Sequence, residues 1–238
     1  MKTALISGAS RGLGFAFSKG LAHRGWRLVI DARDGAELEA AAAGLRRMTE
    51  VQAISGDVTD EAHRHHLVAA AHQTGSLDLL VNNASYLGPS PQPELADYPV
   101  EVLERVYSTN LLAPLRLIQL GLPLLRESDG RIINITSDAA VEDYAGWGGY
   151  GSSKAALEQL SHVLAAEQPG LRIYWVDPGD MRTRMHQEAF PGEDISDRPL
   201  PDVSVPGLLE LAEGHLPSGR YKAREVAGGC AVAAWAEA

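Results

Sequence analysis

The sequence predicts an α/β domain built on a doubly wound, parallel β-sheet with helices on both faces. Short apolar runs alternate with longer helical patterns along most of the 238 residues. The runs are apolar nearly throughout, which is typical of strands covered on both faces. Strand–helix–strand units of this kind have right-handed crossovers and parallel strands. No repeat or linker interrupts the pattern, so we expect a single domain over residues 1–238.

Each apolar run is assigned a strand, and each longer pattern between runs a helix. Pro114 and Pro123 lie inside one long helical pattern, so we expect that helix to be kinked or split. The stretch SGRYKAREV, 218–226, is a candidate seventh strand. The expected strands cover 3–7, 27–31, 51–55, 77–82, 131–136 and 172–177, and the expected helices cover 12–24, 35–48, 60–74, 98–126, 150–168 and 206–213.

Composition narrows the class of partners. The formal net charge is −10, and a nucleic-acid surface needs clustered Lys and Arg, so no nucleic-acid partner is expected. The single cysteine, Cys230, allows no internal disulfide and fits a reducing compartment. The opening MKTALISG has no signal-peptide core, and no apolar run is long enough to cross a membrane. We expect a soluble cytoplasmic protein that does not bind membranes.

A glycine-rich turn, ISGASRGLG, follows the first strand and opens the first helix. Gly8, Gly12 and Gly14 allow a tight turn and a close backbone approach to a ligand. The helix N-terminus then offers free N–H groups and a positive dipole end to a pyrophosphate. An ordinary strand–helix turn is the alternative, because a glycine triplet alone is a weak signal.

Further motifs follow in order along the chain. They are NNAS (Asn82–Ser85), NITS ending in Ser137, Tyr150 with Lys154 as Y-x-x-x-K, and DPG (Asp177–Gly179). With the G-x-x-x-G-x-G spacing, they make residues 3–183 resemble the compact, single-domain branch of the short-chain dehydrogenase/reductases. The resemblance implies a Rossmann fold, a nicotinamide cofactor and a substrate cleft at the carboxyl ends of the strands.

Reduction of a carbonyl by hydride requires a proton donor for the developing alkoxide. A tyrosine with an ordinary pKa near 10 becomes a better donor when a neighbouring cation lowers that pKa. Lys154 stands four residues after Tyr150, on the same helix face, so we expect it to lower the pKa of Tyr150. The resemblance implies that Tyr150 is the general acid–base and that Lys154 also binds the nicotinamide ribose. It further implies that Ser137 binds the substrate oxygen and that Asn110 holds a relay water.

Each of these residues has a plain structural alternative. Tyr150 could be a packed aromatic residue, Lys154 a solvated one and Ser137 a strand-end cap. Asn110 could simply accommodate the kink near Pro114. The order and spacing of the four residues favour the catalytic interpretation.

The second strand ends in a sequence that bears on cofactor choice, VIDARD. An acid at this strand end binds the ribose 2′-hydroxyl, whereas an arginine accommodates a 2′-phosphate. Asp31 and Ala32 point to opposite faces, and Ala32 holds the position where NAD-preferring members carry the acid. We therefore predict NADP(H), with its phosphate clamped by Arg11 and Arg33. NAD(H), with both arginines as surface charges, remains the alternative.

The resemblance also assigns the other cofactor contacts. It places Asp57 and Val58 against the adenine and Thr183 on the nicotinamide carboxamide, although Asp57 could equally be a turn residue before a helix. The expected cofactor-binding residues are Gly8, Ser10, Arg11, Gly12, Leu13, Gly14, Arg33, Asp57, Val58, Asn83, Ala84, Tyr150, Lys154, Pro178, Gly179 and Thr183.

The substrate side is predicted from residues that follow strand ends. We expect a lid within 184–216, whose first part, 184–206, is rich in proline. Gly148 and Gly149 are expected to leave room for a bulky substrate beside Trp147. Loop packing is the alternative for all of these residues. The expected lining residues are Tyr144, Trp147, Ser85, Tyr86 and Met181, with Met185 and Phe190 from the lid.

Three features depart from these motifs or stand outside them. The histidines of HRHH (63–66) are interpreted as a solvated helix face, and no metal is expected. YGSSK stands where the family usually has Y-x-A-S-K, and Ser85 replaces the glycine of N-N-A-G. The tail AGGCAVAAWAEA does not match the family's usual end, which leaves the oligomeric state open.

We therefore predict an oxidoreductase that transfers a hydride between NADP(H) and a small carbonyl or secondary alcohol. An NAD-dependent alcohol dehydrogenase, a β-ketoacyl thioester reductase and a catalytically idle dinucleotide-binding sensor are the alternatives. A homodimer or homotetramer is expected from the resemblance.

Overall fold

A seven-stranded parallel sheet forms the centre of the computed structural model, which describes residues 1–226. The strand order is β3-β2-β1-β4-β5-β6-β7, so the α/β class and the seventh strand are confirmed. The predictions for Cys230 and the rest of the tail lie outside the described residues. The strands are β1 (Thr3–Ile6), β2 (Arg27–Ala32), β3 (Val51–Ser55), β4 (Leu79–Asn82), β5 (Arg131–Ile135), β6 (Arg172–Asp177) and β7 (Gly219–Lys222).

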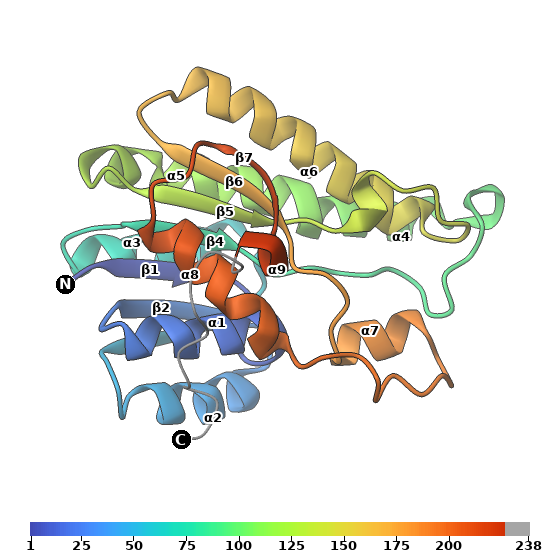
Figure 1. Ribbon diagram of the computed structural model, residues 1–238, viewed down its shortest axis with the longest axis horizontal. Helices are drawn as coiled ribbons and strands as arrows, with labels where there is room; N and C mark the ends of the chain where they lie inside the picture. Colours follow the sequence, from blue (N-terminus) through green and yellow to red (C-terminus); the bar gives the residue numbers. More distant parts are fainter. Residues whose placement is uncertain (227–238) are drawn as a thin grey trace.

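Helices cover both faces of the sheet (Figure 1). One face carries α1 (Gly12–His23), α2 (Gly35–Leu45) and α8 (Val205–Glu213). The other carries α3 (Glu61–Gln73), α5 (Ala113–Glu127) and α6 (Gly148–Glu167). The remaining helices are α4 (Val100–Tyr107), α7 (Arg184–Ala189) and α9 (Ala223–Val226). Within residues 1–226, no helix combines the length and the apolarity needed to cross a membrane.

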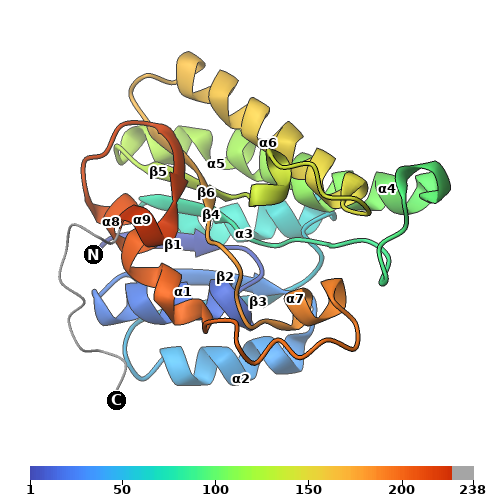
Figure 2. The ribbon, with the colours of Figure 1, turned by 45° about the vertical axis from the view of Figure 1, so that its right-hand side comes forward.

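The expected lid, 184–216, divides into two parts. The first part, including α7, lies beyond the strand ends, whereas α8 lies along α1 (Figure 2). Val205, Leu208 and Leu211 of α8 are fully buried in the core. The lid prediction is therefore wrong for α8, and only 184–204 stays available for that role.

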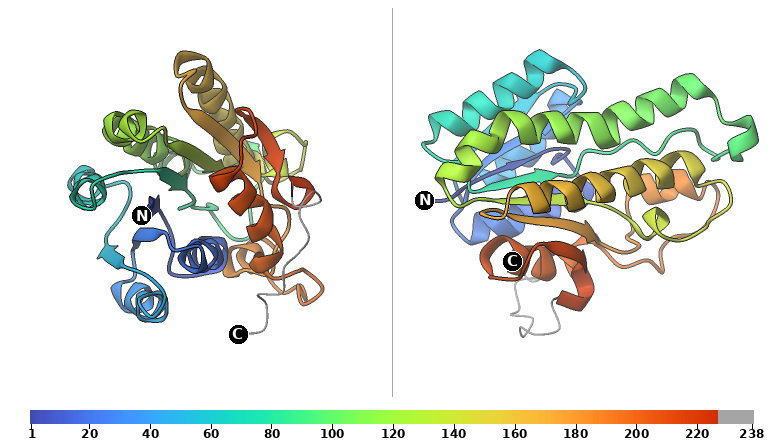
Figure 3. Two further views of the ribbon diagram at one scale, coloured as in Figure 1. Left: turned by 60° about the vertical axis from the view of Figure 1, so that its left-hand side comes forward. Right: turned by 90° about the horizontal axis from the view of Figure 1, so that it is seen from above.

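Helices lie on both sides of the sheet (Figure 3), and an apolar layer on each side holds them to it. Phe17 and Trp26 are buried in the layer under α1, and Leu67 and Leu117 in the layer under α3 and α5. β1 pairs with β2 on one side and with β4 on the other, so the sheet is wound in two directions from this strand. Ligands of such sheets bind in the crevice at that switch point.

The long helical segment expected at 98–126 is interrupted by a π turn at Ser108–Leu112, between α4 and α5. Pro114 has no N–H, so it cannot donate to the carbonyl of Asn110, and the wider turn accommodates this loss. Pro123 lies inside α5 and does not end it. The predicted irregularity is thus a π turn with Asn110, fully buried, at its centre.

An ion pair from β7 fixes the end of β5. The Arg220 guanidinium donates to both carboxylate oxygens of Glu158, at 3.0 and 3.2 Å. Glu158 also accepts the Thr136 hydroxyl at 2.7 Å, and Arg220 donates to the Ser137 carbonyl at 3.2 Å. The last strand of the sheet therefore holds the segment on which Ser137 stands.

Glu158→Ala should lower the free energy of unfolding by about 3 kcal/mol, because it leaves Arg220 and the Thr136 hydroxyl without their partner. Urea unfolding monitored by circular dichroism measures the change. Glu167→Ala, at an exposed position of the same helix, is the control and should change stability by less than about 0.5 kcal/mol. Equal effects of the two substitutions would contradict a structural role for the ion pair.

Candidate active site

A cavity of about 1160 Å³ opens at the carboxyl ends of the strands. Its wall comes from the glycine turn, the loops after β4, β5 and β6, and α7. The volume is at the upper end for small-ligand sites, and it suits a dinucleotide with a substrate beside it. All the expected cofactor-binding and catalytic residues contribute to the wall except Gly14 and Asn110.

Each glycine of the turn is required, either by a positive φ or by a close contact with the backbone. Gly8 and Gly12 have φ of +67° and +57°. A Cβ on Gly14 would lie 2.4 Å from the Gly8 carbonyl oxygen, whereas a Cβ on Gly12 would meet nothing nearer than 3.6 Å. The amide of Asn83 donates to the Ser7 and Gly8 carbonyls, both at 2.9 Å. The residues present thus fit a pyrophosphate at the N-terminus of α1. The Asn83 side chain holds the turn in place through its two hydrogen bonds.

Tyr150 and Lys154 stand one helical turn apart at the start of α6, which begins at Gly148, earlier than expected. The Lys154 ammonium lies 5.5 Å from the centre of the Tyr150 ring and donates to the Ile135 carbonyl at 2.8 Å. A Cβ on Gly151 would lie 2.5 Å from the Ala139 carbonyl oxygen. Glycine at this position therefore lets α6 approach the Ser137 segment closely.

Burial sets the protonation of the tyrosine and the lysine. Burial raises the pKa of Tyr150 above its ordinary value, and the neighbouring Ser85 hydroxyl opposes the rise. The carboxylates of Asp138 and Asp177 raise the same pKa further. Burial also lowers the pKa of Lys154 to about 8. The net shift of the Tyr150 pKa is therefore upward, because burial outweighs the other influences, and the lowering of this pKa by Lys154 stays a prediction.

Asn110 uses its whole amide on protein partners. Its Nδ2 donates to the Tyr86 carbonyl at 3.0 Å and to Ser153 Oγ at 2.9 Å. Its Oδ1 accepts from the Tyr86 N–H at 2.8 Å and from Ser85 Oγ at 3.2 Å. Ser85, treated in the sequence only as a departure from glycine and a cavity residue, thus stands beside both Asn110 and Tyr150. A relay water would have to bind the backbone carbonyl of Asn110 rather than its side chain.

Asp138 is a neighbour of Ser137 that the sequence interpretation missed. The Ser137 hydroxyl donates to Asp138 Oδ1 at 2.8 Å, and the Tyr144 hydroxyl donates to Oδ2 at 3.2 Å. Ser137 must therefore turn its proton away from Asp138 to bind a substrate oxygen. The only signal in the sequence was the acidic residue directly after the serine.

An aromatic group surrounds Trp147. Its ring meets the Tyr150 ring edge-to-face at 5.9 Å and lies 5.8 Å from the Phe190 ring. Trp147, Ser85, Tyr86, Met181 and Met185 line the cavity as expected, whereas Tyr144 and Phe190 pack behind Trp147.

The two glycines after Trp147 leave room for neighbouring side chains of the protein rather than for a substrate. A Cβ on Gly148 would lie 2.3 Å from Leu95, and one on Gly149 would lie 2.3 Å from the Tyr98 ring. Both contacts come from the loop between β4 and α4. The expectation that these glycines leave room for a bulky substrate is therefore wrong.

At the opposite end of the cavity, Arg33 is exposed on the wall, whereas the Asp31 carboxylate is buried. Arg11 donates to both carboxylate oxygens of Glu37, each at 2.9 Å, and Ser10 donates to the same carboxylate at 3.0 Å. Glu37, from the first turn of α2, is a second residue that the sequence interpretation missed.

Asp57 and Thr183, which are also expected to contact the cofactor, each form hydrogen bonds within the protein. Asp57 accepts the backbone N–H and the hydroxyl of Thr59, at 2.9 and 2.8 Å. Thr183 caps α7 by accepting the His186 N–H at 3.2 Å, and its hydroxyl proton stays free to bind a ligand.

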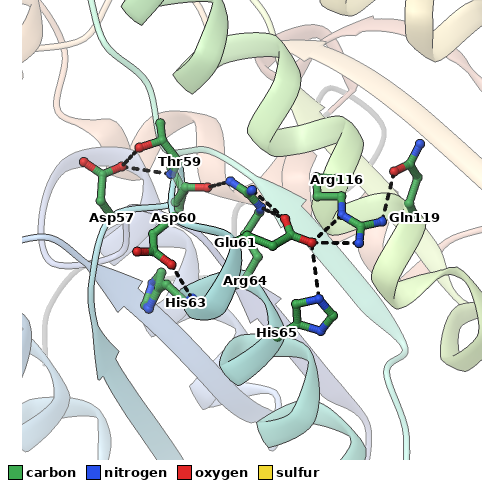
Figure 4. A network of polar contacts seen from close by, with 10 residues as sticks. Asp57, Thr59, Asp60, Glu61, His63, Arg64, His65, Arg116 and Gln119 are labelled. Carbon is green, nitrogen blue, oxygen red and sulfur yellow. Dashed lines mark hydrogen bonds and ion pairs between the residues drawn. The ribbon is translucent and has the colours of Figure 1, made fainter.

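The histidines of α3 do not share one environment. His63 is only 6% exposed, so its assignment to a solvated face is wrong, whereas His65 and His66 are exposed. Figure 4 shows His63 and His65 on different sides of the helix, with His65 3.2 Å from Glu61. Among residues 1–226, no three His, Cys, Asp or Glu side chains gather as metal ligands. The absence of a metal stays a prediction.

This fold and this arrangement of side chains define a nicotinamide-dependent oxidoreductase of the doubly wound class. Residues 2–194 match the family model described as short chain dehydrogenase, and the chain belongs to that family.

Three comparisons place it within the family. It is 35% identical over 233 residues to the rhamnolipids biosynthesis 3-oxoacyl-[acyl-carrier-protein] reductase of Pseudomonas aeruginosa, covering 92% of this chain and 83% of that one. It is 32% identical to the benzil reductase ((S)-benzoin forming) of Saccharomyces cerevisiae, covering 88% and 80%. The alcohol dehydrogenase of Thermococcus sibiricus, solved with 5-hydroxy-NADP, superimposes with a TM-score of 0.80 at 28% identity, covering 93% and 95%.

Lys154→Met should raise the free energy of unfolding at pH 7 by about 2 kcal/mol. Burying the ammonium costs on the order of 3 kcal/mol, given the Lys154 pKa of about 8, and the substitution removes this cost. The substitution also removes the hydrogen bond to the Ile135 carbonyl, which stabilises the wild type by about 1 kcal/mol. Between pH 8 and the unfolded value of 10.5, the unfolded state binds more protons, so wild-type stability rises with pH. The advantage of Lys154→Met should shrink over that range.

Urea unfolding at pH 7, 8, 9 and 10 measures both effects. Lys222→Met, at an exposed lysine, is the control and should follow the wild type. A Lys154→Met protein less stable than the wild type at every pH would contradict a buried, costly charge.

Proposed function

We propose that the chain is an NADP(H)-dependent carbonyl reductase or alcohol dehydrogenase with Tyr150 as its general acid–base. The observation that supports this most is the convergence of Ser137, Tyr150 and Lys154 on the cavity that the glycine turn also lines. The fold alone would support many chemistries, so the proposal rests on these side chains.

A nicotinamide cofactor, when bound, supplies or accepts the hydride. In reduction, the Ser137 hydroxyl leaves Asp138 and donates to the substrate oxygen, which holds the carbonyl against the Tyr150 phenol. Tyr150 then gives its proton to the developing alkoxide. The Lys154 ammonium, 5.5 Å from the ring centre, stabilises the phenolate that remains. Asn110 fixes Ser85, whose hydroxyl neighbours that of Tyr150.

Two observations favour NADP(H) and one opposes it. The Asp31 carboxylate already bonds the Gly8 N–H and His63, whereas Arg33, which lines the same part of the cavity as Asp31, is exposed and free to meet a phosphate. The T. sibiricus neighbour was solved with an NADP derivative. Against this, the Glu37 carboxylate forms an ion pair with Arg11, so a 2′-phosphate must compete with that carboxylate for the Arg11 guanidinium. NAD(H) is therefore retained as the alternative cofactor.

A thioester reductase and an idle sensor differ in what supports them. The name of the P. aeruginosa relative supports a β-ketoacyl thioester reductase, although the net charge of −10 offers no general basic surface for a carrier. The presence of Asn110, Ser137, Tyr150 and Lys154 together argues against an idle sensor. A cytoplasmic location and a homodimeric or homotetrameric state stay predictions.

Tyr150→Phe should lower kcat by about 10²–10⁴-fold, because it removes only the proton donor. NADPH affinity, measured by fluorescence, should change by no more than about threefold, since the ring remains in place. NADPH oxidation with ketones, aldehydes and β-ketoacyl thioesters measures turnover and names the substrate class. Equal turnover by wild type and Tyr150→Phe would end the proposed mechanism.

Arg33→Ala should weaken NADPH binding by about tenfold and leave NADH binding unchanged, because only the phosphate needs the charge. Glu37→Gln should tighten NADPH binding, because the competing carboxylate is gone. Glu39→Gln, on the same helix and paired with Arg46, is the matched control. Unchanged NADPH affinity in Arg33→Ala would move the assignment to NAD(H).

A further inference from the structure

A buried carboxylate ties α3 to the cofactor turn. Asp31, 1% exposed at the end of β2, accepts the Gly8 N–H at Oδ1, 2.8 Å away. Its Oδ2 lies 3.0 Å from Nε2 of His63, which is itself 6% exposed. Gly8 is the first glycine of the turn that would hold the pyrophosphate. The position of that turn therefore depends on an acid–imidazole pair outside the proposed chemistry.

The backbone and the ring of His63 each have a fixed neighbour. The Asp60 carboxylate caps the backbone N–H of His63 at 3.0 Å (Figure 4). The ring packs over Gly56, where an added Cβ would lie 2.3 Å from Nδ1. An ionised Asp31 only accepts hydrogen bonds, so Nε2 of His63 carries the proton between them.

The net charge of the Asp31–His63 pair depends on whether Nδ1, the second ring nitrogen of His63, carries a proton. With a neutral imidazole, the pair carries one negative charge, and an isolated buried carboxylate is costly. Burial accordingly raises the pKa of Asp31. With a protonated imidazole, the pair has no net charge. A pyrophosphate brought onto the adjacent turn repels the negative pair and not the neutral one.

We propose that Asp31 and His63 are positioning residues for the glycine turn and that binding of a dinucleotide makes this buried pair take up a proton. The proposal rests on the proposed function only for its premise that the turn binds a dinucleotide. Cofactor affinity then increases as the pH falls, because proton uptake is linked to binding.

Some charged groups around the Asp31–His63 pair favour its uptake of a proton, and others oppose it. The Asp57 carboxylate, from the loop after β3, raises the pKa of Asp31 and favours proton uptake. Arg33, next on the chain after β2, and Arg105, from α4, face Asp57 and offset part of its charge. Asp60 of α3 adds negative charge at the backbone of His63, and the exposed pair of Arg11 and Glu37 is balanced. All of these groups are unchanged when His63 alone is replaced.

Isothermal titration calorimetry of the intact chain provides the test. Titration of NADH at pH 7 in two buffers of different ionisation enthalpy gives the number of protons taken up per cofactor. NADPH is run in parallel, because its 2′-phosphate titrates near pH 6 and adds its own protons. His63→Gln keeps an N–H donor toward Asp31 but does not titrate. His66→Gln, at an exposed position of the same helix, is the matched control.

The wild type and His66→Gln should take up on the order of half a proton per NADH, and His63→Gln close to none. The Kd for NADH should fall at least about threefold from pH 8 to pH 6 in the wild type and stay level in His63→Gln. If His63→Gln does not fold, Asp31→Asn gives a second test, since its amide oxygen still accepts the Gly8 N–H while its N–H, turned toward Nε2, opposes protonation of His63.

The possible failures are distinguishable. Dinucleotide binding with the same proton uptake in the wild type and His63→Gln would overturn the role of the pair and leave the proposed function intact. Failure of the wild type to bind either dinucleotide would overturn both.

Discussion

The pairing of β1 with β2 on one side and β4 on the other is the constraint on which the site depends. Because the crossovers leave in opposite directions from this strand, a crevice remains at its carboxyl end. The glycine turn after β1 and Asn83 after β4 meet there, and the Asn83 amide bonds the turn directly.

Burial of polar groups is the main cost of the arrangement. Lys154, Asp31 and Asn110 are each almost fully buried, and each is held by specific partners. Asn110 satisfies all its amide groups within the protein, whereas Lys154, among the partners in residues 1–226, bonds only the Ile135 carbonyl and keeps a strongly lowered pKa. The site thus contains fully satisfied polar residues that support it and incompletely satisfied ones that face the cavity.

Much of the fold was predictable because its strands are nearly continuous apolar runs and its helices lie between them. The convergence of Ser137, Tyr150 and Lys154 followed from parallel strands ending at one edge. His63 could have been recognised as buried, since Leu67, four residues later, shares its face of α3. The roles of Glu37, Asp138 and Gly148 depend on contacts with residues far away in the chain or on side-chain orientation, and no local pattern records these.

The hold that β7 has on the Ser137 segment joins the two ends of the sheet's second half. Arg220 bonds Glu158 across 62 residues of the chain, and it also bonds the Ser137 carbonyl. A domain of this kind folds as a unit. The segment that presents Ser137 to the cavity therefore reaches its final geometry only when the last strand has joined the sheet.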